Sequence, residues 1–241
     1  MNSIWAIVPA AGRGTRVGGP LPKQYLTLHG RSILEHTLHA LTSHPSIEGV
    51  TVAIAADDVD WPHTLTSMHG KPIVTCVGGA TRAESVRNAL QVTSCKLAVV
   101  HDAARPLLNA HDLQAVVEAA KRNPEHGAIL ASPVADTLKR AMPDGTIAET
   151  VDRSTLWRAL TPQVFQRDAL LAALDQGLAI NGSALTDEAS AMERIGIHPM
   201  LVEGSADNFK ITTVADIAVA DALLTRRRDL ADDNFTENPC G

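Results

Sequence analysis

Aromatic residues are scarce in this sequence and make up 3% of its 241 residues. Proteins that bind single-stranded nucleic acid stack the bases on aromatic side chains, so the composition argues against such a partner. The net charge of −6 points the same way, because polyanions and anionic membranes attract basic proteins. We therefore expect neither a nucleic-acid partner nor a membrane partner.

Cysteine and long apolar runs are also scarce. Cys76, Cys95 and Cys240 show no C-x-x-C spacing, which indicates free thiols in a reducing compartment rather than disulfides or a zinc site. No apolar run reaches the roughly 18 residues of a membrane-spanning helix, and the N-terminus lacks a signal-peptide pattern. His36 and His39 have helical spacing, but no third metal ligand lies nearby in the sequence. We expect a cytoplasmic protein.

Apolar strand-like runs alternate with amphipathic stretches, which is typical of an α/β fold with a mostly parallel, twisted sheet. Ser32 and Thr81 each precede a glutamate three residues later, a capping-box pattern that begins a helix. Asn109 and Thr213 are further helix caps. The expected strands are Ile4–Val8, Val50–Ala55, Ile73–Val77, Leu97–His101, Ala128–Ala131 and Met200–Val202. The pattern predicts one domain over residues 1–224 and a polar, disordered tail over 225–241.

A polar segment interrupts this alternation. Thr137–Val151 reads as two short β-runs around the turn Pro143-Asp144-Gly145, within a β-arm at about 134–154. The arm has too little apolar surface to be stable alone, so a partner subunit could cover it; a solvated surface ribbon is the alternative.

The strongest motif follows the first expected strand. Ala10-Ala11-Gly12-Arg13-Gly14-Thr15-Arg16 is rich in glycine and arginine, and Lys23 comes shortly afterwards. Glycines let a backbone close around a phosphate, while N–H groups and cations neutralise its charge. The third glycine of the dinucleotide fingerprint is missing, since Val17 occupies its place, and the ATPase loop is absent. The motif favours a polyphosphate site over an ordinary turn with solvated cations.

Two further strand ends carry polar residues. Asp102 and Arg105 follow the apolar run Val99-Val100. Ligands of open α/β sheets bind beyond such strand ends, so Asp102 could hold Mg²⁺ on nucleotide phosphates and Arg105 could bind a second phosphate. An Asp–Arg pair that ties a loop together is the alternative. Gly79 and Ser85 lie in a small-residue turn that could admit a planar base, or form a plain capped turn.

Later segments add candidates with weaker signals. Asp187 and Glu188 begin a helix and suit its dipole, which is a structural role. Lys210 lies near a late strand end and could bind phosphate. Arg153 and Thr161 follow the hairpin Thr137–Val151 and flank Trp157, so they could line the surface on which it docks.

Taken together, these segments resemble the 2-C-methyl-D-erythritol 4-phosphate cytidylyltransferase family over about residues 4–224. The resemblance rests on motifs in the same order along the chain, namely Ala10-Ala11-Gly12-x-Gly14-x-Arg16, Pro22-Lys23-Gln24, Gly78-Gly79, Arg82-x-x-Ser85, His101-Asp102-Ala103-Ala104-Arg105-Pro106, Asp136-Thr137, Asp152-Arg153, Thr161-Pro162-Gln163, Thr186-Asp187-Glu188 and Asn208-Phe209-Lys210. Mild departures are Val17, where methionine is common, and Val214, where proline is frequent.

This resemblance implies a Rossmann-like nucleotidyltransferase fold whose β-arm is exchanged in a homodimer. It implies that the phosphate of methylerythritol phosphate attacks the α-phosphorus of CTP and releases pyrophosphate, with Mg²⁺ as cofactor. The catalytic residues it implies are Arg16, Lys23, Arg153 and Lys210. The implied CTP-binding residues are Ala10, Ala11, Gly12, Gly14, Gly79, Ser85, Asp102 and Ala103, with Asp102 on the metal side. The implied substrate-binding residues are Arg105, Thr137, Thr161 and Thr186.

The residues agree with this chemistry, because a phosphate nucleophile is already anionic and needs cations more than a general base. The alternatives are a ribitol-5-phosphate cytidylyltransferase of the same fold and a catalytically inactive nucleotide-binding regulator. The intact Arg16, Lys23, Asp102 and Lys210 argue against the second alternative.

Overall fold

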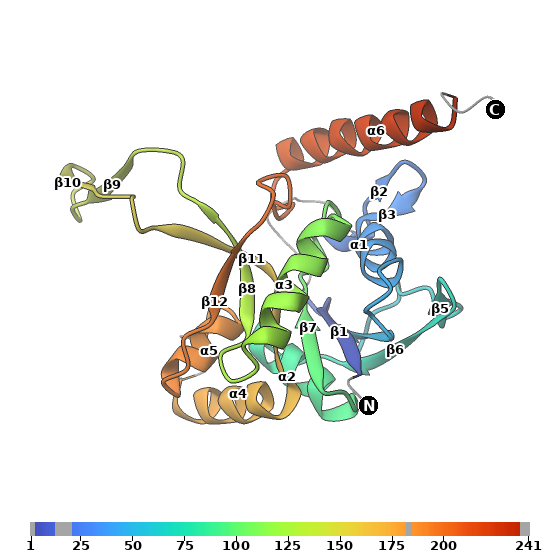
Figure 1. Cartoon of the computed structure of the whole chain (residues 1–241), viewed down its shortest axis with the longest axis horizontal. Helices are drawn as coiled ribbons and strands as arrows, with labels where there is room; N and C mark the ends of the chain where they lie inside the picture. The colour runs from blue at the N-terminus through green and yellow to red at the C-terminus, as the bar shows by residue number, and fades with distance from the viewer. Residues whose placement is uncertain (1–2, 13–20, 182–184, 237–241) are drawn as a thin grey trace.

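The computed structural model describes residues 3–12, 21–181 and 185–236. Within these residues, eight strands form one sheet in the order β12-β8-β11-β7-β1-β4-β6-β5 (Figure 1). The strands are β1 (Ile4–Pro9), β4 (Gly49–Ile54), β5 (Ser67–Met68), β6 (Lys71–Val77), β7 (Leu97–Val100), β8 (Ala128–Pro133), β11 (Trp157–Gln166) and β12 (Met200–Glu203).

Strand β1 lies in the middle of the sheet and pairs in parallel with β4 and β7. The parallel pairs β4–β6 and β12–β8 extend this pattern, so the mostly parallel sheet and its six expected strands are confirmed. Strand β11 was not expected from the sequence. It runs antiparallel between β7 and β8. The polar stretch Thr161-Pro162-Gln163 interrupts its apolar pattern and hides the strand.

Helices cover both faces of the sheet. Along β1, Ala6 and Val8 face one apolar core with α1 and α3, and Ile7 faces the other core with α2, α4 and α5. This alternation is the period of a strand buried on both sides. The helices are α1 (Ile33–Thr42), α2 (Arg82–Val92), α3 (Ala110–Arg122), α4 (Arg167–Asn181), α5 (Glu188–Arg194) and α6 (Val214–Thr236), with the short 3-10 turn η1 (Lys23–Tyr25).

The expected caps start their helices. Ser32 and Thr81 accept hydrogen bonds from the N–H groups of Glu35 and Glu84, and both capping boxes are complete. Asn109 caps α3 in the same way, through the N–H of Asp112. Helix α4 is an element that the sequence pattern did not predict.

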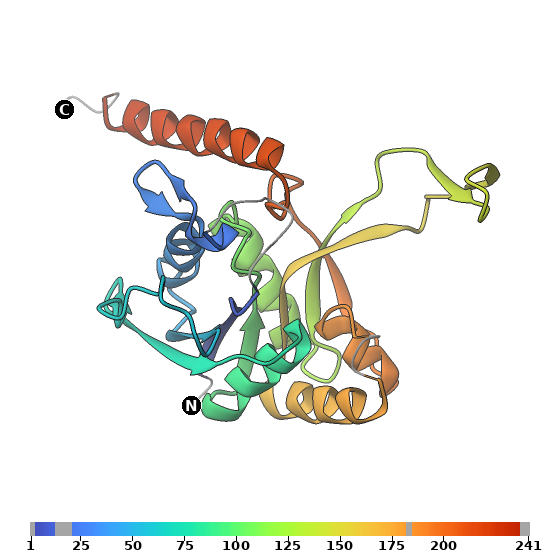
Figure 2. The ribbon, with the colours of Figure 1, turned by 180° about the vertical axis from the view of Figure 1, so that it is seen from behind.

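Helix α6 crosses the molecule above α1 and the small hairpin of β2 (Thr27–Leu28) and β3 (Arg31–Ser32) (Figures 1 and 2). Ala220 of α6 is buried in a core with Leu28, Ile33 and Leu107. The helix continues to Thr236, well past residue 224, where we expected a disordered tail to begin. Its packed first half nucleates the helix, and good helix formers such as arginine, alanine and leucine extend it.

The β-arm projects away from the sheet (Figures 1 and 2). Strands β9 (Leu138–Ala141) and β10 (Ile147–Val151) pair with each other in a separate two-stranded antiparallel sheet, as the turn signal predicted. Gly145 at the tip has a φ of 85°, a left-handed conformation that favours glycine. Among the described residues, no helix has the length and apolar character that crossing a bilayer requires.

Candidate active site

The loops after β1, β6 and β7 surround a cavity of about 240 Å³. These strands are parallel, so their carboxyl ends meet at one edge of the sheet, where open α/β folds bind ligands. The structure brings together here most of the residues expected to bind CTP. The lining includes Ala10, Ala11, Gly12, Lys23, Gly79, Ser85, Asp102, Ala103 and Lys210.

The start of the glycine loop is held by Gln24. Its buried side chain donates hydrogen bonds to the carbonyl oxygens of Ala10 and Gly12, at 2.9 and 3.1 Å. These bonds fix the loop backbone before a ligand arrives. The expected site residues Gly14 and Arg16 lie outside the described residues.

The turn after β6 requires glycine. A Cβ atom on Gly79 would lie 2.3 Å from the Cβ of Glu84, so a side chain cannot fit there. The N–H of Gly79 donates to the Ser85 hydroxyl at 3.1 Å, and this hydroxyl lies 2.9 Å from the carbonyl oxygen of Thr81. Ser85 therefore fixes the turn that lines the cavity.

Asp102 lies at the centre of the site and contacts three cationic side chains. Its Oδ1 is 2.9 Å from Arg82 Nε, and its Oδ2 is 3.2 Å from Arg105 Nε and 3.1 Å from Lys210 Nζ. Burial alone would raise the pKa of Asp102, but the three cations outweigh burial and hold this pKa well below its ordinary value. Asp102 is therefore ionised and gathers positive charge at the strand end.

Arg82 is held from the other side by Glu188. The Glu188 carboxylate is fully buried and binds Arg82 through two bonds, Nη1–Oε1 at 2.6 Å and Nη2–Oε2 at 3.0 Å. Burial would lower the pKa of Arg82, but Glu188 and Asp102 raise it above its ordinary value. The bidentate geometry fixes the plane of the guanidinium, which stays charged at the edge of the cavity.

Asp102 also lines a second cavity, of about 280 Å³. It shares Arg82, Asp102 and Lys210 with the first cavity. Three residues expected to bind the second substrate, Arg105, Thr161 and Thr186, also line it. The site therefore consists of two compartments that meet at one set of charges.

A buried hydrogen-bond chain positions Asp102. The N–H of Asp102 donates to Thr161 Oγ1 at 3.1 Å, and Thr161 Oγ1 is 2.9 Å from His101 Nδ1. His101 Nε2 lies 3.1 Å from the carbonyl oxygen of Arg105. A carbonyl only accepts, so Nε2 carries the proton and Nδ1 accepts the Thr161 proton. Burial lowers the pKa of His101 to about 4, so the ring is neutral and acts in positioning.

Asn208 and Lys23 tie the late segment to the site. The side-chain Nδ2 of Asn208 donates to the backbone carbonyl oxygen of Thr161 at 2.7 Å, and the backbone carbonyl oxygen of Asn208 accepts from Arg105 Nη1 at 2.7 Å. Lys23 Nζ donates to the carbonyl oxygen of Ile211 at 2.8 Å. These bonds hold the segment of Lys210 against the strand ends.

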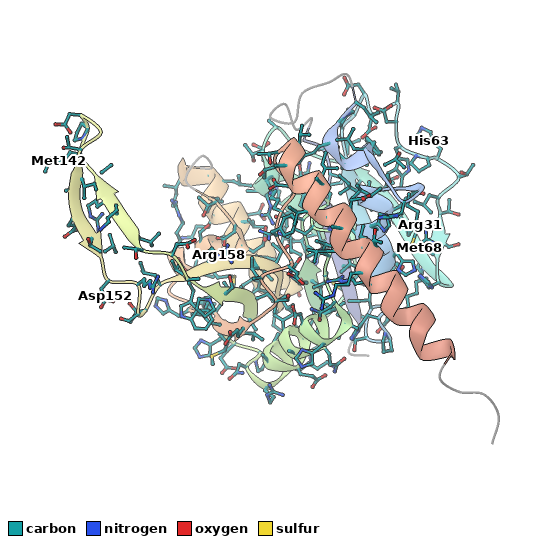
Figure 3. All side chains as sticks on the ribbon, turned by 90° about the horizontal axis from the view of Figure 1, so that it is seen from above. Arg31, His63, Met68, Met142, Asp152 and Arg158 are labelled. Carbon is teal, nitrogen blue, oxygen red and sulfur yellow. The ribbon has the colours of Figure 1, made fainter. Side chains whose placement is uncertain are left out.

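Two expected site residues are not brought into either cavity. Thr137 and Arg153 lie on the β-arm, where Arg153 donates to the carbonyl oxygen of Ala135. Figure 3 shows that the neighbouring Asp152 lies far out on the arm, beyond Arg158 at its base. Thr137 and Arg153 are both absent from the described walls of the two cavities within this one chain.

Sequence reasoning assigned no chemical role to Arg82, and gave Glu188 only a helix-dipole role. Both residues occupy the first position of a helix, α2 and α5 respectively. An acidic residue suits that position, but a cation is disfavoured by the helix dipole. An arginine at the first position after the capping residue Thr81 was therefore a feature of the sequence that indicated a specific acidic partner.

The carboxyl edge of a doubly covered α/β sheet carries here two cavities that share Arg82, Asp102 and Lys210, which suits an enzyme that transfers a group between phosphorylated ligands. A family model described as 2-C-methyl-D-erythritol 4-phosphate cytidylyltransferase matches residues 4–226. The chain belongs to this family.

Individual relatives agree with the family assignment. A relative from Xanthomonas oryzae pv. oryzae (strain PXO99A) with that name is 52% identical over 99% of this chain and 88% of that protein. One from Stenotrophomonas maltophilia (strain K279a) is 54% identical over 93% of this chain and 98% of that protein. The crystal structure of the Francisella tularensis enzyme of that name aligns with a TM-score of 0.77 at 37% identity, covering 91% of this chain and 98% of that one.

Proposed function

We infer that this enzyme joins CTP and 2-C-methyl-D-erythritol 4-phosphate, giving 4-diphosphocytidyl-2-C-methyl-D-erythritol and pyrophosphate. The observation that carries this inference is the pair of compartments that share Arg82, Asp102 and Lys210. One compartment is lined by Ala10, Ala11 and Gly12, the described start of the glycine loop, and suits the nucleotide. The other contains Arg105, Thr161 and Thr186 and suits a phosphorylated polyol.

The reaction needs two anions to meet at one phosphorus. The substrate phosphate attacks the α-phosphorus of CTP, a new P–O bond forms, and the bond to pyrophosphate breaks. The nucleophile is already ionised, so the protein supplies positioning and positive charge rather than a general base. Lys23 and Lys210 line the nucleotide compartment, and we assign to them, with Arg16, the stabilisation of the charge that develops during transfer.

We propose Mg²⁺ as the cofactor. Asp102 is the one acidic residue among the described residues that line the nucleotide compartment. A single carboxylate suits Mg²⁺, which takes its remaining ligands from phosphates and water. Asp102 would contribute that ligand once its contact with Lys210 or Arg105 opens, and the ion would neutralise triphosphate charge.

We propose that the β-arm forms a homodimer and brings Arg153 and Thr137 to the site of the neighbouring subunit. Almost every residue of β9 and β10 is exposed, and large apolar side chains are exposed along the arm, with Met142 at 48% and Ile147 at 63%. An isolated two-stranded hairpin is marginally stable in water, so a partner that covers it is expected. An exchanged arm gives a closed two-fold dimer.

The alternatives are less well supported. The family assignment disfavours a ribitol-5-phosphate cytidylyltransferase. An inactive regulator does not need Lys23, Asp102 and Lys210 around one cavity.

The activity is tested by measuring pyrophosphate release with each of the four common ribonucleoside triphosphates against methylerythritol 4-phosphate and ribitol 5-phosphate. We expect release with CTP and methylerythritol 4-phosphate. Preference for ribitol 5-phosphate, or for another triphosphate, would overturn the assignment.

The exchanged arm is tested by mixing two inactive variants, Arg153→Ala and Lys23→Ala, under conditions of subunit exchange. If the arm acts in trans, a mixed dimer has one site with both lesions and one site with neither, so activity returns to as much as about half of wild type. If Arg153 acts in its own subunit, every site keeps one lesion and no activity returns. Native mass spectrometry confirms that mixed dimers have formed.

A further inference from the structure

A further, larger cavity of about 640 Å³ shares no described lining residue with the two compartments of the active site. Its walls come from the β2–β3 hairpin, α1, the segment 106–110 and α6. In Figure 3, Arg31 lies beside α6, and this residue lines the cavity together with Arg227 of α6. The volume is in the range of small-molecule sites, roughly 300–1,000 Å³.

The polar lining of this cavity is basic. Arg31, Arg227, His29, His36 and His39 line it, and no aspartate or glutamate is among the described lining residues. This is unusual for a protein with a net charge of −6.

Several of these side chains are held in place. Arg227 donates to the carbonyl oxygen of Leu107 at 2.8 Å. His36 Nε2 lies 2.8 Å from the carbonyl oxygen of Leu28 and donates to it, because a carbonyl only accepts. His29 lies 3.2 Å from Asp221 of α6, the one acidic side chain that touches this group in the described part of the chain. The cluster is therefore largely pre-organised.

The surroundings of His39 disfavour its charged form. The ring of His39 contacts the ring of His69 edge-on, with 4.6 Å between the ring centroids. Burial lowers the pKa of His39, and His69, Arg31 and His36 lower this pKa further. These surroundings therefore favour the neutral ring of His39, and a bound anion would favour its charged form.

Apart from Ser43, the rest of the lining is apolar. Pro106, Leu108 and Leu224 form one wall, and Ala40 and Ala110 also contribute. We propose that this cavity is a second anion-binding site, which takes a small phosphorylated molecule with an apolar portion. The phosphate lies among Arg31, Arg227 and the histidines, and the apolar portion lies on Pro106, Leu108 and Leu224.

The walls connect this site to the active site along the chain. Pro106 directly follows Arg105, and α6 begins shortly after Lys210. A ligand in the cavity therefore contacts the same segments that hold two cations of the catalytic cluster.

The test follows the ring resonances of His39 by NMR during pH titrations of the whole protein, with and without inorganic phosphate. A nearby anion favours the charged ring, so phosphate should raise the pKa of His39 by about one unit. His44 is the internal control, because burial also lowers its pKa but it does not line the cavity. Phosphate in the active site does not touch His39, so this readout separates the two sites.

The variant Arg31→Gln with Arg227→Gln should lose the phosphate-induced shift, with at least about tenfold weaker phosphate binding. The matched control is Arg226→Gln, which removes an exposed arginine of the same helix that does not line the cavity. Monobutyl phosphate tests the apolar wall, since each buried methylene should strengthen binding by about fourfold.

The proposal is overturned if phosphate leaves His39 unchanged, if it shifts His44 equally, or if the double variant keeps the full shift. Monobutyl phosphate that binds no more tightly than inorganic phosphate would overturn the assignment of the apolar wall.

Discussion

Replacing Glu188 by glutamine tests whether the buried pair of Glu188 and Arg82 organises the active site. Glutamine keeps the size of the side chain but removes the charge that both guanidinium bonds need. Glu188 is 0% exposed, and the side chain of Arg82 is 25% exposed. Removing one partner of a buried pair costs about 3–5 kcal/mol, and Arg82 retains Asp102 and some water, so we expect a loss of about 2–4 kcal/mol.

The matched control is Asp175→Asn, which removes the partner of Arg87. This pair has a similar N–O distance of 2.8 Å, but its side chains are 37% and 47% exposed. Exposed pairs contribute about 0–1 kcal/mol, so the control should unfold almost like wild type. Urea unfolding followed by circular dichroism measures both free energies.

A double-mutant cycle with Arg82→Gln separates the pair from other effects. If the two side chains act together, the double variant loses less stability than the sum of the single variants. A Glu188→Gln protein as stable as the Asp175→Asn control would refute the reasoning. So would strictly additive losses in the cycle.

Three further changes test other parts of the site. Lys23→Ala should lower kcat by about 10²-fold or more, because it removes a charge-stabilising donor; a pyrophosphate-release assay with near-normal kcat would refute that role. Asp102→Asn should shift the Mg²⁺ dependence of activity to higher concentration, and an unchanged Mg²⁺ titration would remove Asp102 from the metal site. The pKa of His101 falls from 6.5 to about 4 on folding, so between these pH values only the unfolded chain binds this proton. The free energy of unfolding therefore falls by about 3 kcal/mol as the pH drops through that window. His101→Gln should remove this loss, so unfolding free energies at about pH 7 and about pH 4.5 should differ less than in wild type; an unchanged difference would contradict the neutral buried ring.

The sequence predicted those parts of the fold that follow from local patterns. The apolar run of β1, the capping boxes at Ser32 and Thr81, and the turn at Gly145 depend on neighbouring residues, and all three formed as expected. Strand β11 was missed because its polar middle, which carries Thr161, is buried only by contacts between distant segments.

The sequence indicated the site residues that directly follow an expected strand. It did not indicate those whose role depends on an ion pair between residues far apart in the sequence. Asp102 was visible because it ends an apolar run. Its partner Arg82 begins helix α2, and Glu188 lies 106 residues further along the chain from Arg82. No local pattern brings such residues together, so Glu188 looked like an ordinary residue of a helix N-terminus.

The central claim is that the phosphate of methylerythritol phosphate attacks the α-phosphorus of CTP in this enzyme. It is tested most directly with methylerythritol phosphate whose phosphate oxygens are isotopically heavy and with unlabelled CTP. Both products are then analysed by mass spectrometry. We predict that all of the heavy oxygen stays in the cytidylyl product and that pyrophosphate contains none. Heavy oxygen in pyrophosphate, or no cytidylyl product from CTP, would contradict this account.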